Sequence, residues 1–452
     1  MIVIDPNTGQ RIRDYAEHSP PEAAVLLERA VRAFEAWRET PLLERARLLH
    51  AAAGALRARC GEHARLMTRE MGKPIGAAEA EVEKCALTCD FFADHAFAFL
   101  APEPVVTEAA KSYVRFDPLG VVLAVMPWNF PFWQVFRCAA PALAAGNAVA
   151  LKHASNVPGS ALAIEQVFRE AGFPEGLFTA LMVRSRLVPD LIRHPAVSAV
   201  SLTGGEPAGV AVAALAGAAL KKTVLELGGS DPFIVLADAD PVAVAQPAAL
   251  ARTVNNGQSC IAAKRFIVEE AVAPRFEQAL VERMRGLAVG DPADRATQVG
   301  PLAREDLLAE LHAQVTRSLA AGATLGCGGA RLDRPGFFYA PTVLTGVRPG
   351  MPAFDEETFG PVAAVTRARD ADHAVELANR SRYGLGASVW SGDRARGEAL
   401  AARLEAGAVF VNEAVRSDPR LPFGGVKRSG YGRELAAFGI REFVNVKTVW
   451  VR

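Results

Sequence analysis

The sequence lacks the patterns that build metal centres and disulfide frameworks. Its six cysteines include no C-x-x-C pair, and its eight histidines show no H-x-x-x-H spacing. Zinc sites and disulfide-stapled domains depend on such closely spaced residues. We therefore expect no metal site and, in a reducing cytosol, thiols that stay free.

An excess of one charge is also missing, as is any long apolar run. Lys and Arg together number 50 and balance 50 Asp and Glu, so the chain has no charge pattern that attracts nucleic acid or an anionic membrane. Its longest apolar run, 210–220, is shorter than the ~18 to 20 residues that a membrane span needs. The first residues do not form a signal peptide. We expect a cytoplasmic protein whose partner is a small molecule, with no nucleic acid and no membrane.

Short apolar runs alternate with helical stretches from about Tyr113 onward, which is typical of βαβ units in a parallel sheet. One series extends from "GVVLAVM" to "TVLEL", and a second from "PFIVL" to "GAVFVN". The pattern predicts an α/β protein with two Rossmann-like parallel-sheet domains that meet near Gly228. Before them, "SPPEAAVLLERAVRAF" predicts a helix with a capping box at Ser19, and "TPLLERARLLH" suggests the same device again.

Polar residues follow four of the apolar runs in the first series. Asn129, Lys152 and Glu226 each end a run, and the Gly-rich turn "TGGEPAG" (203–209) ends another. One charged residue at a strand end commonly marks only an exit into solvent, and a Gly-rich turn alone is ordinary loop chemistry. Ligands bind at the carboxyl ends of parallel strands, so four such ends together indicate a binding site.

A cysteine stands in "NNGQSCIAAKRF" (255–266) behind a glycine and ahead of small residues. An isolated Cys260 would be read as a small buried hydrophobe, because most unpaired cysteines are inert. Its interpretation as a nucleophile depends on partners elsewhere in the chain.

Five ordered motifs supply those partners. The motifs are "PWNFP" (127–131), "LELGGSDPF" (225–233), "NNGQSCIAAKR" (255–265), "EETFGPV" (356–362) and "LPFGGVKRSGYGRE" (421–434). In this order and spacing they resemble the aldehyde dehydrogenase superfamily over nearly the whole chain. Within it, the short N-terminus and "LKHASN" look most like bacterial succinate-semialdehyde dehydrogenases.

The resemblance implies a mechanism in which a thiolate attacks an aldehyde, hydride leaves to a nicotinamide, and water cleaves the thioester. Cys260 matches the family's nucleophile and Glu226 its general base, whose pKa an apolar site would raise. Asn129, with the backbone N–H of Cys260, matches the donors that hold the oxyanion. The alternative for Asn129 is a simple turn residue.

For the cofactor, Lys152 resembles the lysine that reaches the adenosine ribose, while Glu357 and Phe359 resemble the pair at the nicotinamide ribose. Ser155 stands where many NAD-preferring members carry an acidic residue, which would repel a 2′-phosphate. We therefore expect NADP in preference to NAD, with NAD still possible. At Gly205 the family commonly has serine, so one phosphate hydrogen bond is expected to be lost. The other expected cofactor contacts are Pro127, Trp128, Thr203, Gly204, Gly209 and Leu227.

Arg137 resembles an arginine with which semialdehyde dehydrogenases bind the substrate carboxylate, since its fork suits a carboxylate. Ser417 and Arg420 are further candidates for this role. Together they favour oxidation of succinate semialdehyde to succinate through a cysteine thiohemiacetal and thioester. Alternatives are the same chemistry on glutarate semialdehyde or an aliphatic aldehyde, a cofactor-free thiol esterase, and a dinucleotide-binding protein without catalysis.

The family pattern also implies a division of the chain. Residues 1–110 and 121–227 are expected to form the dinucleotide-binding domain, and residues 228–427 the catalytic domain. Residues 111–120 and 428–452 are expected to form a small β-rich oligomerisation element. The resemblance implies a homodimer or homotetramer.

Overall fold

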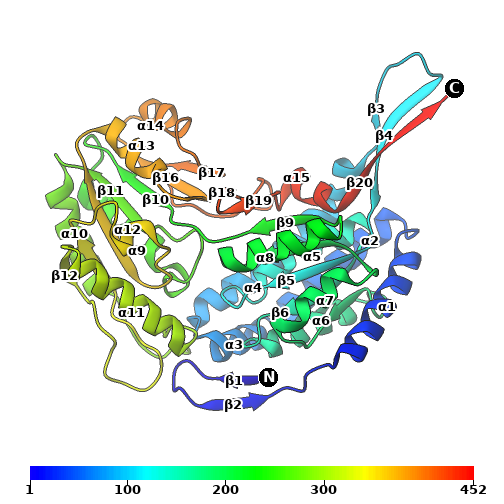
Figure 1. The fold of residues 1–452 in the computed structure, drawn as a ribbon, viewed down its shortest axis with the longest axis horizontal. Coiled ribbons are helices and arrows are strands. Elements are labelled where there is room, and N and C mark those ends of the chain that lie inside the picture. Colours follow the sequence, from blue (N-terminus) through cyan, green and yellow to red (C-terminus); the bar gives the residue numbers. More distant parts are fainter.

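The computed structural model describes residues 1–452 as two α/β lobes and a projecting arm (Figure 1). The lobe that carries the first sheet lies beside the lobe that carries the second, and the arm extends away from the first lobe to the chain's C-terminus. Two parallel sheets and a separate β-rich element agree with the fold expected from the strand pattern.

The first lobe is built on a six-stranded sheet in the order β19-β9-β8-β5-β6-β7. All neighbours in it are parallel except β19, which pairs antiparallel with β9. Every residue of β5 and β6 is buried, as expected for parallel strands covered by helices on both faces. The strands are β5 (Val121–Met126), β6 (Ala148–His153), β7 (Phe178–Ala180), β8 (Val197–Thr203), β9 (Lys222–Glu226) and β19 (Gly430–Tyr431).

The second lobe is built on a seven-stranded sheet in the order β12-β13-β14-β11-β10-β16-β17. Only β12 is antiparallel to its neighbour. The five apolar runs of the second series are all strands here, and β12 and β13 are two strands that the sequence analysis did not predict. The strands are β10 (Pro232–Val235), β11 (Arg265–Glu269), β12 (Thr324–Cys327), β13 (Thr342–Thr345), β14 (Val362–Ala368), β16 (Gly386–Trp390) and β17 (Ala408–Val411).

Helices surround both sheets (Figure 1). Those of the first lobe are α1 (Pro20–Trp37), α2 (Leu42–Ala58), α3 (Cys60–Met71), α4 (Ile75–Leu100), α5 (Trp133–Ala145), α6 (Pro158–Glu170), η1 (Ser185–Leu187), α7 (Val188–Arg193), α8 (Glu206–Ala218), α15 (Ala436–Ile440) and η3 (Arg441–Phe443). Those of the second are α9 (Pro241–Thr253), η2 (Val254–Gly257), α10 (Ala273–Arg285), α11 (Glu305–Ala320), α12 (Pro352–Asp355), α13 (Ala371–Asn379) and α14 (Arg394–Ala401).

The predicted cap of the first helix is confirmed, and that of the second is wrong. The Ser19 hydroxyl accepts a hydrogen bond from the Glu22 backbone N–H, and the Glu22 carboxylate accepts one from the Ser19 backbone N–H, which is a complete capping box. At α2 the N-cap is Pro41, which has no side-chain donor or acceptor. The hydroxyl of Thr40 donates to the Ala36 carbonyl instead.

The arm is a three-stranded antiparallel sheet in the order β20-β4-β3. Its strands are β3 (Glu103–Pro104), β4 (Lys111–Pro118) and β20 (Val444–Val451). The predicted segment 428–452 does not all join the arm, because β19 extends the first sheet and α15 packs against α5. Two further antiparallel pairs are β1 (Ile2–Ile4) with β2 (Arg11–Asp14) and β15 (Tyr383–Gly384) with β18 (Val426–Lys427).

No helix of this fold combines the length and the apolar character that crossing a bilayer requires. Nor do three or more His, Cys, Asp or Glu side chains gather anywhere in a way that would hold a metal ion.

Candidate active site

A cavity of about 870 Å³ lies at the carboxyl ends of the first sheet's strands and reaches Cys260. The four polar strand ends lie at one edge of the sheet, since β9, β8, β5 and β6 are consecutive neighbours, but only Asn129 and the Gly-rich turn line the cavity. Of the predicted site residues, those on the cavity wall are Pro127, Trp128, Asn129, Thr203, Gly204, Gly205, Leu227, Cys260, Glu357 and Phe359.

The loop before the cysteine has a backbone that few sequences can adopt. Asn255, Asn256 and Gly257 have φ angles of 53°, 60° and 76°. Asparagine and glycine tolerate this left-handed region better than other residues do. A Cβ on Gly257 would lie 2.3 Å from the carbonyl of Gly360. The letters "NNG" are therefore explained by the sharp turn that presents Cys260.

Asparagine side chains hold this turn against the first lobe. The Asn255 amide donates to the Asn129 carbonyl at 2.6 Å, and the Asn129 amide donates to the Gln258 carbonyl at 3.1 Å. The Asn256 amide donates to the carbonyls of Gly72 and Pro301, both at 3.0 Å. An amide nitrogen carries two N–H groups, so Asn129 keeps a second donor for an oxyanion.

Lys264 organises the backbone on the other side of the cysteine, and the sequence analysis had not singled it out. Its ammonium donates to the carbonyls of Ser259, Cys260 and Ala262 at 3.0, 2.9 and 3.2 Å. It also lies 3.6 Å from the Glu357 carboxylate. The available signal was a lysine placed between small residues and an apolar strand, where a charge needs an internal partner.

Glu357 does more than line the cofactor side of the cavity. Its carboxylate accepts a hydrogen bond from the Gly229 backbone at 3.1 Å. A Cβ on Gly228 would lie 2.5 Å from that carboxylate. The glycines after Glu226 therefore allow the loop to approach Glu357 closely.

Cys260 rests as a thiol. Burial raises its pKa to about 12, although the charges of Arg137 and Lys264 act in the opposite direction. A thiol of this kind needs a base or a change of surroundings before it can attack an aldehyde.

Glu226 is the only predicted catalytic residue that does not line the cavity. Its side chain is buried at the end of β9 and neither carboxyl oxygen has a hydrogen-bond partner. Burial raises its pKa well above the usual range, the charge of Arg137 opposes this, and Glu434 adds to it. Burial therefore favours the neutral carboxyl group, and in this conformation the side chain does not reach the cavity.

Three predicted cofactor residues, Lys152, Ser155 and Gly209, do not line the cavity. Lys152, at the end of β6, donates to the Ser185 hydroxyl at 3.2 Å, and burial lowers its pKa to about 8. Ser155 follows that strand and is exposed. Gly209 is required by packing, because a Cβ there would lie 2.5 Å from the Leu227 side chain.

An acidic residue stands in the first turn of α8, beside the predicted phosphate turn. Glu206 lines the cavity, and Arg382 forms an ion pair with it. Arg428 also pairs with Glu206, at 3.6 Å. These arginines offset a carboxylate that would otherwise repel a phosphate at this helix end.

The predicted carboxylate site of Arg137, Ser417 and Arg420 is not formed. Arg137 is 1% exposed, pairs with Glu434, and lies over the Phe423 ring at 4.6 Å. Ser417 accepts a hydrogen bond from another residue, Lys84, at 2.7 Å. The exposed Arg420 pairs with Asp418 at 2.6 Å. The sequence showed three candidate side chains, and each has a different partner in the fold.

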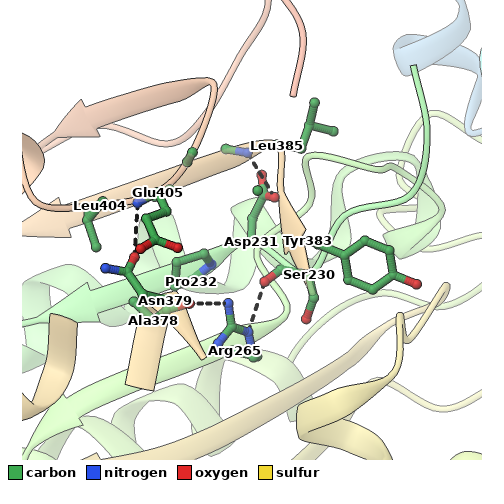
Figure 2. Close-up of a pocket in the computed structure, with 14 residues that line it drawn as sticks. Ser230, Asp231, Pro232, Arg265, Ala378, Asn379, Tyr383, Leu385, Leu404 and Glu405 are labelled. Atoms are coloured by element: carbon green, nitrogen blue, oxygen red, sulfur yellow. Dashed lines mark hydrogen bonds between the residues drawn. The ribbon is translucent and has the colours of Figure 1, made fainter. Parts of the chain in front are cut away.

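A second, very small cavity of about 10 Å³ lies behind the loop after Glu226 (Figure 2). The Arg265 guanidinium spans it, donating to the carbonyls of Ser230, Leu377 and Ala378 at 2.9, 2.8 and 2.9 Å. Asp231 accepts from the Gly386 backbone at 3.1 Å, and burial raises its pKa to about 7. This cluster holds the loop rigid and has room for little more than a water molecule.

The fold and this site together define a dinucleotide-dependent enzyme with a cysteine nucleophile. The chain belongs to the aldehyde dehydrogenase family, whose model, described as "Aldehyde dehydrogenase family", matches residues 1–449. The family explains why Cys260, Asn129 and the Gly-rich turn meet at one cavity.

Its relatives are similar over their full length. A "Probable succinate-semialdehyde dehydrogenase [NADP(+)]" of Synechocystis is 52% identical over 451 residues, covering 100% of this chain and 99% of that one. "Succinate-semialdehyde dehydrogenase [NADP(+)] 1" of Mycobacterium tuberculosis is 51% identical over 456 residues, with coverage of 100% and 99%. The crystal structure of succinic semialdehyde dehydrogenase from Streptococcus pyogenes in complex with NADP+ superposes with a TM-score of 0.97, at 38% identity and coverage of 100% and 99%.

Proposed function

We propose that this chain oxidises succinate semialdehyde to succinate with NADP as the preferred acceptor. The observation that carries the proposal is a complete set of Cys260, Asn129 and Glu226 in a chain at least 51% identical, from end to end, to NADP-dependent succinate-semialdehyde dehydrogenases.

The side chains divide the chemistry among them. Once a base has taken the Cys260 thiol proton, the thiolate attacks the aldehyde carbon and forms a thiohemiacetal, while the Asn129 amide and the Cys260 backbone N–H stabilise the oxyanion. A bound NADP would supply the hydride acceptor that oxidation of this adduct to a thioester requires. Glu226 then takes a proton from the water that cleaves the thioester and releases the carboxylate.

The residues present suit a nucleotide with a 2′-phosphate. Ser155 is exposed and uncharged, and the nearby Lys152 ammonium has no carboxylate partner. A phosphate would supply the negative charge that this lysine lacks. The Gly-rich turn before α8 leaves space for a pyrophosphate, since nothing lies closer than 3.8 Å to a Cβ on Gly204 or Gly205.

The first test is absorbance at 340 nm with succinate semialdehyde, comparing NADP with NAD for wild type and Cys260→Ser. Reduction by wild type alone, faster with NADP, is the expected outcome. Turnover of glutarate semialdehyde or an aliphatic aldehyde in its place would identify the alternative substrate. Turnover of activated esters without nucleotide would indicate the thiol esterase. No turnover of any of these substrates would favour a dinucleotide-binding protein without catalytic activity.

The finer assignments belong to the same proposal. Residues 1–110 and 121–227 bind the dinucleotide, 228–427 carry the nucleophile, and β4 and β20 supply the contacts of a homodimer or homotetramer. The enzyme acts in the cytoplasm.

A further inference from the structure

A buried ion pair contacts the segment that follows Asn129. Glu81 of α4 and Lys73, in the link between α3 and α4, are 4% and 0% exposed and pair with each other. Neither side chain lines the cavity that contains Cys260. A buried ion pair adds little net stability, because the cost of removing both charges from water offsets their attraction. The other contacts of the pair therefore indicate its role.

The Glu81 carboxylate caps the N-terminus of α5. It accepts hydrogen bonds from the backbone N–H groups of Phe132 and Trp133, both at 2.9 Å. The first N–H groups of a helix have no partner within the helix, and the N-cap residue Phe132 provides no side-chain acceptor. The helix dipole also favours a carboxylate at this end. The start of α5 is thus fixed by a residue of another helix.

The residues between α5 and Asn129 are fixed by the same pair. The Lys73 ammonium lies 3.8 Å from the centre of the Phe130 ring, where a cation is attracted to the aromatic face. The Phe130 carbonyl accepts a hydrogen bond from the Gln134 backbone N–H at 3.1 Å, within the first turn of α5. Pro131, the next residue after Phe130, has a restricted backbone. Asn129 directly precedes this segment, so its backbone is constrained from the α5 side.

The cysteine loop constrains Asn129 from the other side. The Asn129 carbonyl accepts from the Asn255 amide, and the Asn129 amide donates to the Gln258 carbonyl. A catalytic donor must lie within about 0.5 Å of its productive position to be fully effective. The place of the oxyanion donor therefore depends on two supports, the turn of η2 and the capped start of α5.

A second buried glutamate provides a comparison in the same lobe. Glu70, which is 2% exposed, caps α6 by accepting from the backbone N–H groups of Gly159 and Ser160 at 2.7 and 2.9 Å. The helix α6 carries none of the three predicted catalytic residues. Glu70 and Glu81 thus make the same kind of contact, but only Glu81 caps the helix next to Asn129.

We propose that Glu81, with Lys73 as its counter-charge, is a positioning residue that fixes the start of α5 and through it the oxyanion donor Asn129. Glu81 itself touches neither substrate nor cofactor. The inference rests on the proposed function, because it requires Asn129 to act on an aldehyde adduct of Cys260.

A double-mutant cycle on kcat/KM for succinate semialdehyde, at saturating NADP, tests this coupling. Glu81→Ala is expected to lower kcat/KM by about 10- to 100-fold, since displacement of an oxyanion donor costs a large part of its effect. In the Asn129→Ala background the same change should cost less than about twofold, because the donor that it displaces is already absent. A purely structural role would give the same factor in both backgrounds.

A rescue variant and a control accompany the cycle. Glu81→Gln combined with Lys73→Met should recover most of the activity, because an amide oxygen still accepts the two hydrogen bonds and no unpaired charge remains buried. The control is Glu70→Ala, whose effect on kcat/KM should be the same factor with and without Asn129→Ala. Urea unfolding of each variant measures how much stability is lost.

The outcomes separate the two proposals. If Glu81→Ala costs the same factor in both backgrounds, or if Glu70→Ala also loses its effect in Asn129→Ala, the positioning role is wrong while the proposed function stands. If wild type oxidises no aldehyde, the proposed function and this inference both fail. Should Glu81→Ala not fold, Glu81→Asp takes its place in the cycle, since it keeps the charge and withdraws the acceptor by one methylene.

Discussion

Burial favours the neutral forms of two ionisable residues, Cys260 and Glu226, at the centre of this enzyme. Cys260 and Glu226 are both desolvated, and burial opposes the thiolate of one and the carboxylate of the other. Catalysis needs substrate, cofactor or a side-chain rotation to change these surroundings, and this leads to predictions for single residues.

Alkylation of Cys260 should depend steeply on pH. The thiolate is the reactive form, and with a pKa of about 12 its fraction increases as pH rises. We expect the rate of inactivation by iodoacetamide, without nucleotide, to rise about tenfold per pH unit between pH 7 and 9. The rate of inactivation is measured from the residual dehydrogenase activity. A rate independent of pH would mean that a thiolate already exists at neutral pH.

Glu226→Gln should lower kcat by about 10²- to 10⁴-fold, the usual contribution of a general base. The charged carboxylate is the base, and burial disfavours it, so wild-type kcat should rise as pH increases through the raised pKa. That rise should be absent in the variant. A rapid burst of reduced cofactor followed by a slow steady state would place the defect in thioester hydrolysis. Loss of the burst as well would assign Glu226 to activation of the thiol.

Ser155→Glu should reverse the cofactor preference. A carboxylate at this exposed position repels a 2′-phosphate and can accept hydrogen bonds from ribose hydroxyls. We expect kcat/KM for NADP to fall by about tenfold or more, which is about 1.4 kcal/mol, and that for NAD to change less. Ser155→Ala serves as the control for loss of the hydroxyl alone. Equal losses with both cofactors would contradict the role of the serine.

At the scale of elements, the loop of η2 restricts the amino-acid sequence more than the strands around it do. Its left-handed turn is set between two lobes by hydrogen bonds from Asn255 and Asn256. Strands and helices tolerate many apolar sequences, but this turn tolerates few.

Gly257→Ala should destabilise the protein by about 2 kcal/mol or more, because the residue has φ of 76° and its Cβ would lie 2.3 Å from Gly360. Activity should fall with stability, since the same turn presents Cys260. Gly54→Ala in α2 is the matched control, as nothing lies within 4 Å of its Cβ, and helix propensity should make it neutral or stabilising by up to about 1 kcal/mol. Urea unfolding measures the free energy of unfolding of both variants. Equal stability of the two variants would contradict the strain at Gly257.

At the scale of the whole molecule, the arm has little to pack against within one chain. Its strand β20 is a sheet edge, and Val446, Trp450 and Val451 are exposed by 61%, 49% and 46%. An open edge with apolar side chains is a site for association.

Val446→Asp should shift the protein toward monomer, because it places a charge in the expected contact of β20 with another copy. Sedimentation velocity measures the shift. Leu43→Asp is the control, since this side chain is 84% exposed and belongs to α2 and not to a strand of the arm. Unchanged assembly in Val446→Asp, or equal dissociation in both variants, would remove β20 from the interface.

The strand periods, the capping box at Ser19, the polar strand ends and the order of the five motifs were all readable in the sequence. Each of these signals lies within a short window, where backbone geometry decides the pattern. What only the tertiary structure decided was pairing between distant side chains: Arg137 with Glu434, Ser417 with Lys84, and Lys264 with the carbonyls around Cys260. Such pairs depend on which elements pack together, and a buried charge takes the partner that the fold brings near. The motifs of the chemistry were therefore visible in the sequence, whereas the partners of its buried charges were not.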